Sequence, residues 1–191
     1  MHSGYPLMGY DYTGPMTDLS YLSTEGDWGA FHELGHNHQY MTAVLPGNTE
    51  ATCNLWSVYV MEQVVGRSRD EAHSALSPAS REDTIQAYID GGRDFWGDWS
   101  VWTALETWLQ LQEAFGWDLF IELNATYLAM PAAERPTTDQ ARIDRMVVES
   151  SFAAGYDLTD FYDAWGFPIS DDSRAAVSGL PMWTDHPMAG R

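Results

Sequence analysis

The sequence contains no lysine, and its nine basic residues are all arginines, against 28 aspartates and glutamates. The formal net charge at pH 7 is therefore −19. Such a surface repels nucleic acid and anionic membranes, because both are negatively charged themselves. We therefore expect no nucleic-acid partner, and a secreted or salt-exposed protein fits this charge.

Cysteine is nearly absent as well, since Cys53 is the only one in 191 residues. A single cysteine excludes an intrachain disulfide and a cluster of thiolate metal ligands. Its largely apolar neighbours favour a buried thiol over a reactive one. No apolar run of 18 residues occurs, and no basic segment followed by an apolar one opens the chain. We therefore expect no membrane span, and no signal peptide is visible in this chain.

The composition that remains is globular, with 45% hydrophobic and 14% aromatic residues, and the length suits one domain with a core. Glycine, proline and capping residues divide the chain into segments of helical periodicity, which predicts a mainly α fold. We expect a loop with a short strand near residues 5–8, then helices over 28–41, 49–65, 80–90, 100–115, 118–130, 138–154, 157–165 and 170–178.

The stretch FHELGHNHQ contains the pattern His-Glu-x-x-His. His32 and His36 are four residues apart, so on a helix both imidazoles lie on one face and can share a metal ion. Glu33 is turned about 100° from His32 around the helix and can take a proton from a metal-bound water. With this composition, the pattern would arise by chance in only about 1% of chains of this length.

A catalytic zinc ion needs a third protein ligand and one open coordination position. Glu50 is the candidate, because it begins the next predicted helix directly after a Pro-Gly turn at 46–47. Glu62 is a rival, but it lies about 18 Å farther along the same helix, so only one of them can reach the metal. The turn favours Glu50. The sequence thus predicts Zn²⁺ bound by the two histidines and Glu50.

Two further residues share faces with these ligands. Asn54 lies four residues after Glu50, where its amide either orients a ligand histidine or is a helix-surface group. Trp28 lies four residues before His32, where it either forms a wall at the mouth of the site or packs in the core. Both alternatives stay open for each residue. His38 falls off the ligand face, which favours packing or a place at the substrate rim.

The segment WGAFHELGHNHQ, followed by the Pro-Gly turn and NTEATCNLWSVYV, resembles the enhancin-like, mucin-degrading zinc metallopeptidases, peptidase family M sixty. In this resemblance His32, Glu33 and His36 match the zinc motif. Glu50 falls at the family's ligand glutamate, and Asn54 at one of its asparagines. The neighbouring Cys53 departs from the family's asparagine pair.

Other parts of the chain carry the same likeness. GYPLM resembles the family's Gly-x-Pro-Ile-Met element, and LQLQEAFGWDLF and FYDAWGFPIS resemble its helical C-terminal portion. The resemblance implies one gluzincin-type catalytic domain over 1–191, which lacks part of the N-terminal sheet region that is present in the larger family domain. Its parts would be the end of the substrate cleft (1–27), the zinc-binding helix pair (28–66) and a C-terminal helical subdomain (67–191).

The resemblance also implies an activity, a zinc-dependent endopeptidase that cuts the backbone of O-glycosylated, mucin-like glycoproteins. It implies a bacterial secreted or cell-surface protein that belongs to a longer chain with carbohydrate-binding modules. The alternative is a catalytically inactive glycan-binding module, or a fragment, that retains a structural zinc site. By residue type alone His73, Tyr88 and Arg93 are candidates to stabilise an oxyanion, and Trp96 to contact a glycan.

Overall fold

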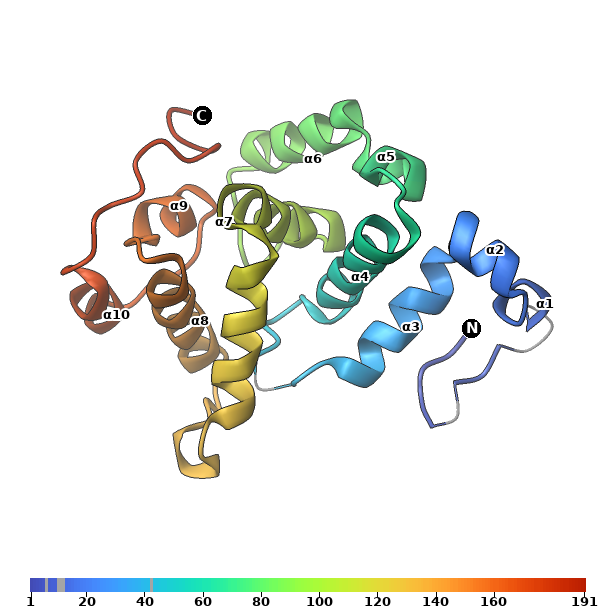
Figure 1. Ribbon diagram of the computed structural model, residues 1–191. Coiled ribbons are helices and arrows are strands. Elements are labelled where there is room, and N and C mark those ends of the chain that lie inside the picture. Colours follow the sequence, from blue (N-terminus) through green and yellow to red (C-terminus); the bar gives the residue numbers. More distant parts are fainter. Residues whose placement is uncertain (6, 10–12, 42) are drawn as a thin grey trace. The chain divides into compact units, whose positions relative to one another are not determined.

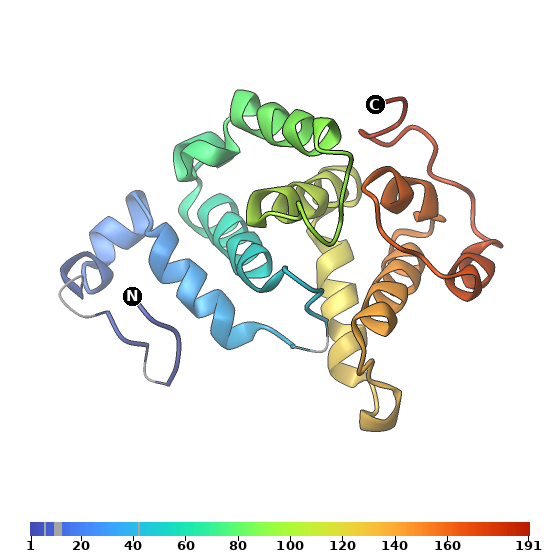
Figure 2. The same cartoon turned by 180° about the vertical axis from the view of Figure 1, so that it is seen from behind.

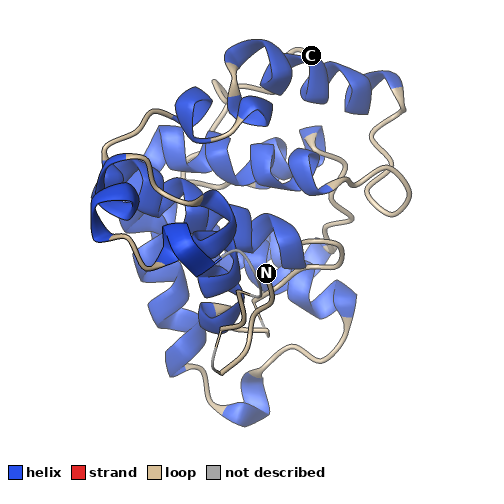
Figure 3. Ribbon diagram, turned by 90° about the vertical axis from the view of Figure 1, so that its right-hand side faces the viewer, coloured by secondary structure: helices blue, strands red, loops and turns tan. Residues whose placement is uncertain are grey.

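The computed structural model describes residues 1–191 except 6, 10–12 and 42, and nearly all of its regular structure is helical (Figure 3). The prediction of a mainly α fold is therefore confirmed. Within the described residues, strand pairing is limited to two isolated bridges, His2 with Met8 and Asp157 with Met182. The short strand expected near 5–8 includes Pro6, which lies outside the described residues. None of the described helices is both long enough and apolar enough to cross a membrane.

Contacts divide the chain into two compact units. We call them the N-terminal unit (Met1–Gln39, Gly47–Ala87 and Val101–Glu106) and the C-terminal unit (Tyr40–Pro46, Tyr88–Ser100 and Thr107–Arg191). The N-terminal unit contains α1 (Thr13–Met16), α2 (Leu19–Thr24), α3 (Trp28–His38), α4 (Thr49–Val60), η1 (Met61–Val65), α5 (Arg69–Ala72), η2 (Ser74–Leu76), most of α6 (Pro78–Asp90) and the start of α7 (Val101–Ala129). The C-terminal unit contains the rest of α7, η3 (Ala132–Glu134), α8 (Asp139–Ala154), α9 (Thr159–Ala164) and α10 (Asp171–Val177).

Helices α3 and α4 lie side by side in the N-terminal unit (Figures 1 and 2). Gly35 allows the close approach, because a Cβ atom there would lie only 3.0 Å from Cys53 Cα and 3.1 Å from Trp56 Cβ. The Ser57 hydroxyl adds a hydrogen bond of 3.2 Å to the carbonyl of Trp28. A helix pair thus brings the His-Glu-x-x-His segment against the segment that follows the Pro-Gly turn.

Several helix ends differ from expectation. The helix predicted over 28–41 ends at His38, because the backbone of Gln39 is already extended (ψ 132°). Helix α6 begins at Pro78 instead of Ser80, since the Ser77 hydroxyl accepts the backbone N–H of Ser80 (3.2 Å) and acts as the cap. Helices α1, α2 and α5 were not predicted at all, because segments of four to six residues carry too little periodicity.

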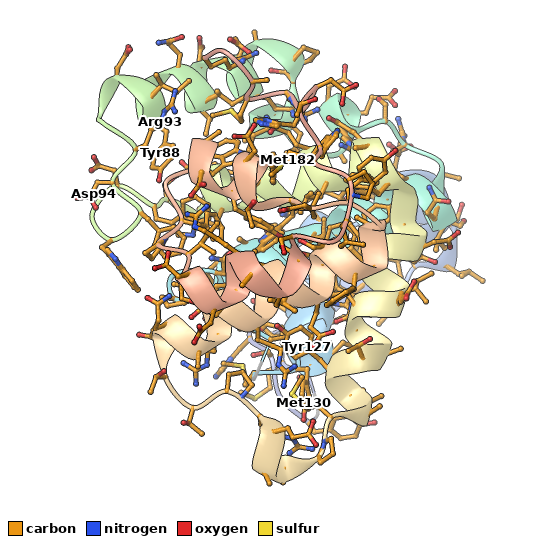
Figure 4. The ribbon with its side chains drawn as sticks, turned by 90° about the vertical axis from the view of Figure 1, so that its left-hand side faces the viewer. Tyr88, Arg93, Asp94, Tyr127, Met130 and Met182 are labelled. Atoms are coloured by element: carbon orange, nitrogen blue, oxygen red, sulfur yellow. The ribbon has the colours of Figure 1, made fainter. Side chains whose placement is uncertain are left out.

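In the C-terminal unit α8 contacts α9 and α10, and large aromatic side chains such as Trp165, Tyr127 and Tyr162 are fully buried. The Trp165 indole donates to Gln110 Oε1 (3.2 Å), and the Tyr88 hydroxyl donates to the Trp165 carbonyl (3.0 Å). Figure 4 shows Tyr88, Arg93 and Asp94 where α6 passes into the following loop. Helix α7 comprises the two predicted helices, 100–115 and 118–130, which meet in a kink at Gly116 (φ 77°, ψ −178°), a non-helical conformation open essentially to glycine alone.

Candidate metal centre

His32 and His36 lie one turn apart on α3, and their ring centroids are 4.8 Å apart with the planes nearly perpendicular. The helix starts where the Asp27 carboxylate accepts the backbone N–H of Ala30 (2.9 Å). Each histidine side chain is 18% exposed, so most of the ring is held by neighbours while one edge is accessible. The helical spacing therefore brings the two rings together as the sequence predicted.

Glu50 is the second residue of α4, and its carboxylate meets both histidines. Its Oε2 atom lies 3.0 Å from His32 Nε2 and 3.4 Å from His36 Nε2. The turn that precedes α4 contains Gly47 in the left-handed region (φ 72°), which lets the chain reverse after residue 46. Glu62, the rival third ligand, lies in η1 and forms an ion pair with Arg69 (2.5 Å) instead.

The opposite edge of each histidine ring faces a side-chain amide. His32 Nδ1 lies 2.7 Å from Asn54 Oδ1, and Asn54 is buried, so the alternative of a helix-surface amide does not apply. His36 Nδ1 lies 3.1 Å from Gln39 Oε1. An amide oxygen can only accept a hydrogen bond, so each contact is a hydrogen bond when Nδ1 carries the hydrogen, and in that tautomer Nε2 has a lone pair for a metal ion.

Gln39 was not among the residues predicted from sequence. The signal that could have found it is its position three residues after His36, at the end of the metal-binding helix. Metal-ligating histidines generally donate their second N–H to such an acceptor. The extended backbone that turns Gln39 toward α4 was not visible in the helical pattern, which continued past it.

Cys53 offers a second possible ligand set, because one atom each of His32, His36 and Cys53 lies within 4.8 Å of the others. The Cys53 sulfur, however, lies 2.9 Å from His36 Nδ1, on the edge of the ring away from Glu50. Burial, followed by the nearby charges of Glu50 and Glu33, raises the pKa of the Cys53 thiol to about 12. The set with Glu50 is the better one, since it leaves both Nδ1–H groups with their amide partners.

The residues fit a zinc ion in kind and in spacing. Two nitrogens and a carboxylate oxygen are ordinary zinc ligands, and tetrahedral ligand atoms at bonds of about 2.0–2.1 Å lie about 3.3 Å apart. The observed separations from Glu50 Oε2 are 3.0 Å and 3.4 Å. Three lone pairs that converge in this way repel one another unless a cation, either a metal ion or a proton, lies between them.

Glu33 follows His32 on α3 and is half-buried. Within the described part of the chain it forms no ion pair, and its charge acts on the nearby Cys53 thiol. Glu33 is thus adjacent in sequence to the first histidine and near the α4 residue Cys53, which is consistent with the place expected for it beside the metal ligands. His38, by contrast, stacks on Trp56 (centroids 5.0 Å apart, planes at 26°), away from the ligand face.

Trp28 packs against His73, with ring centroids 5.0 Å apart, and His73 in turn lies 4.7 Å from the ring of Trp102. Burial lowers the pKa of His73, whose Nδ1 accepts the backbone N–H of Ala75 (3.1 Å). Trp28 is thus part of an aromatic stack. It also lines a cavity of about 360 Å³ whose lining residues include Glu25, Asp27 and Glu71. Arg67 already pairs with two of these groups, Glu25 and Glu71.

The other candidates for stabilising an oxyanion are engaged in the C-terminal unit. The Tyr88 hydroxyl is buried and bound to the carbonyl of Trp165, and burial raises its pKa above the ordinary tyrosine value. Arg93 donates to the carbonyl of Arg191. Trp96 has 58% of its surface exposed, as expected for a residue outside the core.

The chain is similar to vertebrate proteins over nearly its whole length. It is 44% identical over 190 residues to TRPM8 channel-associated factor 2 of Homo sapiens, covering 98% of this chain and 20% of the human protein. It is 40% identical over 191 residues to the TRPM8 channel-associated factor homolog of Danio rerio, covering 99% of this chain and 21% of that protein. The chain therefore spans about a fifth of the length of the curated relatives it matches.

These relatives correct one expectation from the sequence. We predicted a bacterial secreted or cell-surface protein, and this prediction is wrong, because the chain is 43–44% identical over 190 residues to channel-associated factors of the vertebrates Bos taurus, Xenopus laevis and Homo sapiens. The acidic composition that suggested secretion is equally compatible with other settings, since it constrains solubility and partners and not the compartment.

A solved structure shares the fold. The crystal structure of a conserved protein of unknown function from Bacillus anthracis str. Ames matches with a TM-score of 0.77 and 26% identity, covering 91% of this chain and 35% of that one. The sequence itself matches the family described as Peptidase M60, enhancin and enhancin-like, over residues 1–166, which include both helices of the candidate metal centre. The chain belongs to this family of enhancin-like peptidases.

Proposed function

We propose that this chain is the catalytic domain of a zinc-dependent endopeptidase. The observation that carries the proposal is the place of Glu50 Oε2, 3.0 Å from His32 Nε2 and 3.4 Å from His36 Nε2, with Glu33 next to His32 on the same helix. Membership of a peptidase family supports the same conclusion. His32, His36 and Glu50 would bind Zn²⁺, and this set leaves one position open for water and substrate.

The role of each group in peptide hydrolysis follows from its chemistry. Zinc, when bound, supplies Lewis-acid polarisation of the scissile carbonyl and makes water acidic enough to attack near neutral pH. Glu33 accepts the proton of the attacking water and then delivers it to the leaving amine. Asn54 and Gln39 hold the two ligand histidines in place, because their amide oxygens accept the Nδ1–H groups of His32 and His36.

The test of this mechanism is Glu33→Gln, which keeps the shape of the side chain and removes its ability to accept a proton. We expect zinc content equal to wild type and a loss of peptide hydrolysis of at least about 10²-fold, the usual contribution of general acid–base catalysis. Glu122→Gln is the matched control, since this exposed glutamate lies on α7. Hydrolysis that persists in the Glu33 variant would exclude Glu33 as the base.

We infer that the substrates are O-glycosylated, mucin-like glycoproteins, on the strength of the family resemblance. Digests of a mucin-type glycoprotein, before and after enzymatic removal of its glycans, are compared by mass spectrometry. Cleavage sites next to glycosylated serine or threonine should disappear after glycan removal. Cleavage that is unaffected would contradict the glycoprotein specificity while leaving the peptidase proposal intact.

A second candidate function is suggested by the vertebrate relatives, which are named TRPM8 channel-associated factors. In this alternative the domain is a binding module for a TRPM8-type channel or for glycoproteins, and its zinc site is structural. Co-purification of the channel with wild type and with Glu33→Gln separates the two functions. A binding module should retain the channel in both variants and cleave no glycoprotein in either, whereas a peptidase loses cleavage in the variant alone.

A further inference from the structure

We propose that Gln39 is a positioning residue of the candidate metal centre, which holds His36 in the tautomer that binds zinc through Nε2. The inference rests on the proposed zinc site and extends it to a residue outside the His-Glu-x-x-His motif. Gln39 does not contact the metal itself in this proposal and acts through His36.

The geometry links three elements of the site through one amide group. Gln39 directly follows α3, and its backbone is extended, so its half-buried side chain turns back toward α4. Its Oε1 atom lies 3.1 Å from His36 Nδ1. Its Nε2 atom donates to the Thr49 carbonyl and to the Thr52 hydroxyl oxygen. Because Glu50 follows Thr49 directly, the amide connects one ligand to the backbone that carries another.

The orientation of this amide is determined by its partners. The Thr49 carbonyl can only accept, so the NH₂ group of Gln39 must face α4 and the amide oxygen must face His36. The Thr52 hydroxyl donates its own hydrogen to a backbone carbonyl of the same helix, that of Asn48 (3.1 Å) or Thr49 (3.2 Å), which leaves its oxygen as an acceptor for Gln39. An acceptor at Nδ1 fixes the proton there.

Two neighbours compete with this arrangement. Glu50 would accept a proton from His36 Nε2, and the Cys53 thiol, 2.9 Å from Nδ1, would donate to that nitrogen. Together these contacts favour the opposite tautomer, in which Nε2 carries the hydrogen and cannot bind a metal. The thiol is only a weak hydrogen-bond donor, and Glu50 Oε2 lies 3.4 Å from His36 Nε2, beyond the ordinary hydrogen-bond distance, whereas Gln39 Oε1 lies within it at 3.1 Å from Nδ1. Gln39 is therefore the group that sets the zinc-binding tautomer.

The experiment measures zinc affinity of the 191-residue chain by competition with a chromophoric chelator. Gln39→Leu removes both functions of the amide, and Gln39→Glu keeps an acceptor for His36 while losing the donor to α4. The matched control is Gln63→Leu, because Gln63 is an exposed glutamine of η1. We expect Gln39→Leu to weaken zinc binding by about 10–100-fold, as loss of an outer hydrogen-bond partner does. Gln39→Glu and Gln63→Leu should stay close to wild type.

If Gln39 only linked α3 to α4, both substitutions would weaken zinc binding equally, since both remove the donor to Thr49 and Thr52. Equal losses in the Leu and Glu variants, or no loss in Gln39→Leu, would overturn the proposal. Nitrogen chemical shifts of the His36 ring, recorded on zinc-free protein at mildly alkaline pH, supply a second readout. The hydrogen should reside on Nδ1 in wild type and move to Nε2 in Gln39→Leu.

The two readouts distinguish this proposal from the proposed function. If wild type bound no zinc and the tautomer still changed in Gln39→Leu, the zinc peptidase would be excluded and the role of Gln39 in positioning His36 would stand. If zinc bound and was used for hydrolysis, but neither affinity nor tautomer responded to Gln39→Leu, the peptidase would stand and the positioning role would be excluded.

Discussion

At the scale of single residues, the two edges of the His36 ring have different partners. Nε2 faces Glu50 at 3.4 Å, while Nδ1 faces Gln39 at 3.1 Å and Cys53 at 2.9 Å. A metal ion bound through Nε2 therefore takes Glu50 as its third ligand, and one bound through Nδ1 takes Cys53. The identity of the third ligand thus depends on which nitrogen is free of hydrogen.

Substitution of the two candidate ligands distinguishes these alternatives. We expect Glu50→Gln to weaken zinc binding strongly, because a neutral amide oxygen replaces an anionic ligand. Cys53→Ala should leave the zinc affinity near the wild-type value, although removal of a buried side chain lowers stability. Isothermal titration with zinc on both variants is the measurement. If Cys53→Ala weakened zinc binding strongly and Glu50→Gln did not, the third ligand would be Cys53.

Much of this site could be predicted from the sequence, and the limit has a physical reason. The i, i+4 spacing brings His32 and His36 together on any regular helix, and the Pro-Gly turn returns the chain so that Glu50 reaches them. Gln39 depends on where α3 stops, which is a matter of backbone geometry beyond the helical pattern. That His32, His36 and Glu50 bind zinc, and that Glu33 is the base, stay predictions.

At the scale of elements, the α3–α4 contact depends on a residue without a side chain. The backbone of Cys53 would lie 3.0 Å from a Cβ atom at Gly35, whereas a Cβ atom at Gly29 of the same helix would have its nearest neighbours at 3.5 Å and 3.8 Å. The two glycines share a helix and differ in their surroundings. Alanine substitutions at the two positions therefore distinguish the effect of helix propensity from the effect of packing between α3 and α4.

We predict opposite effects of alanine at these two positions. Gly35→Ala adds a methyl group against backbone, at a cost of about 1–3 kcal/mol that exceeds the gain in helix propensity of about 1 kcal/mol. Gly29→Ala has room and should raise the free energy of unfolding by up to about 1 kcal/mol. Urea unfolding of zinc-free protein measures both. Equal effects at the two sites would mean that Gly35 does not set the helix separation.

Element boundaries were predicted well where a cap residue determines them. Helix α8 runs from Asp139 to Ala154, between a Thr138 cap and Gly155 in the left-handed region, within one residue of the predicted start. Helix α6 started two residues early because Ser77, and not Ser80, satisfies its first N–H groups. Both are serines before a helical pattern, and only the fold shows which one turns its hydroxyl inward.

At the scale of the whole molecule, long-range contacts decide features that no local pattern contains. The division into two compact units joins 101–106 to the N-terminal unit and 40–46 to the C-terminal unit, which sequence reading could not foresee. Three features of the whole protein stay predictions. They are the single catalytic domain over 1–191, its attachment to carbohydrate-binding modules and its mucin-like substrates. The net charge, by contrast, is a property that the sequence determines completely.

That charge has a measurable consequence for stability. Ion pairs with carboxylates already engage Arg67, Arg69, Arg81, Arg142, Arg145 and Arg174. The excess of 19 negative charges is therefore left mainly to repel itself across the surface, which opposes the compact state. Sodium chloride weakens this repulsion, because the Debye length falls from about 30 Å at 0.01 M to about 8 Å at 0.15 M ionic strength.

We accordingly predict that the melting temperature rises with salt over this range. A gain of about 1 kcal/mol corresponds to about 2–4 °C for a chain of this size. Exposed ion pairs also weaken with salt, but each contributes only about 0–1 kcal/mol, so the repulsion among the excess carboxylates should dominate. Calorimetry with excess zinc keeps the metal site saturated, and sucrose is the control for solvent effects without charge. A melting temperature that falls with salt would show that the arginine pairs outweigh the repulsion.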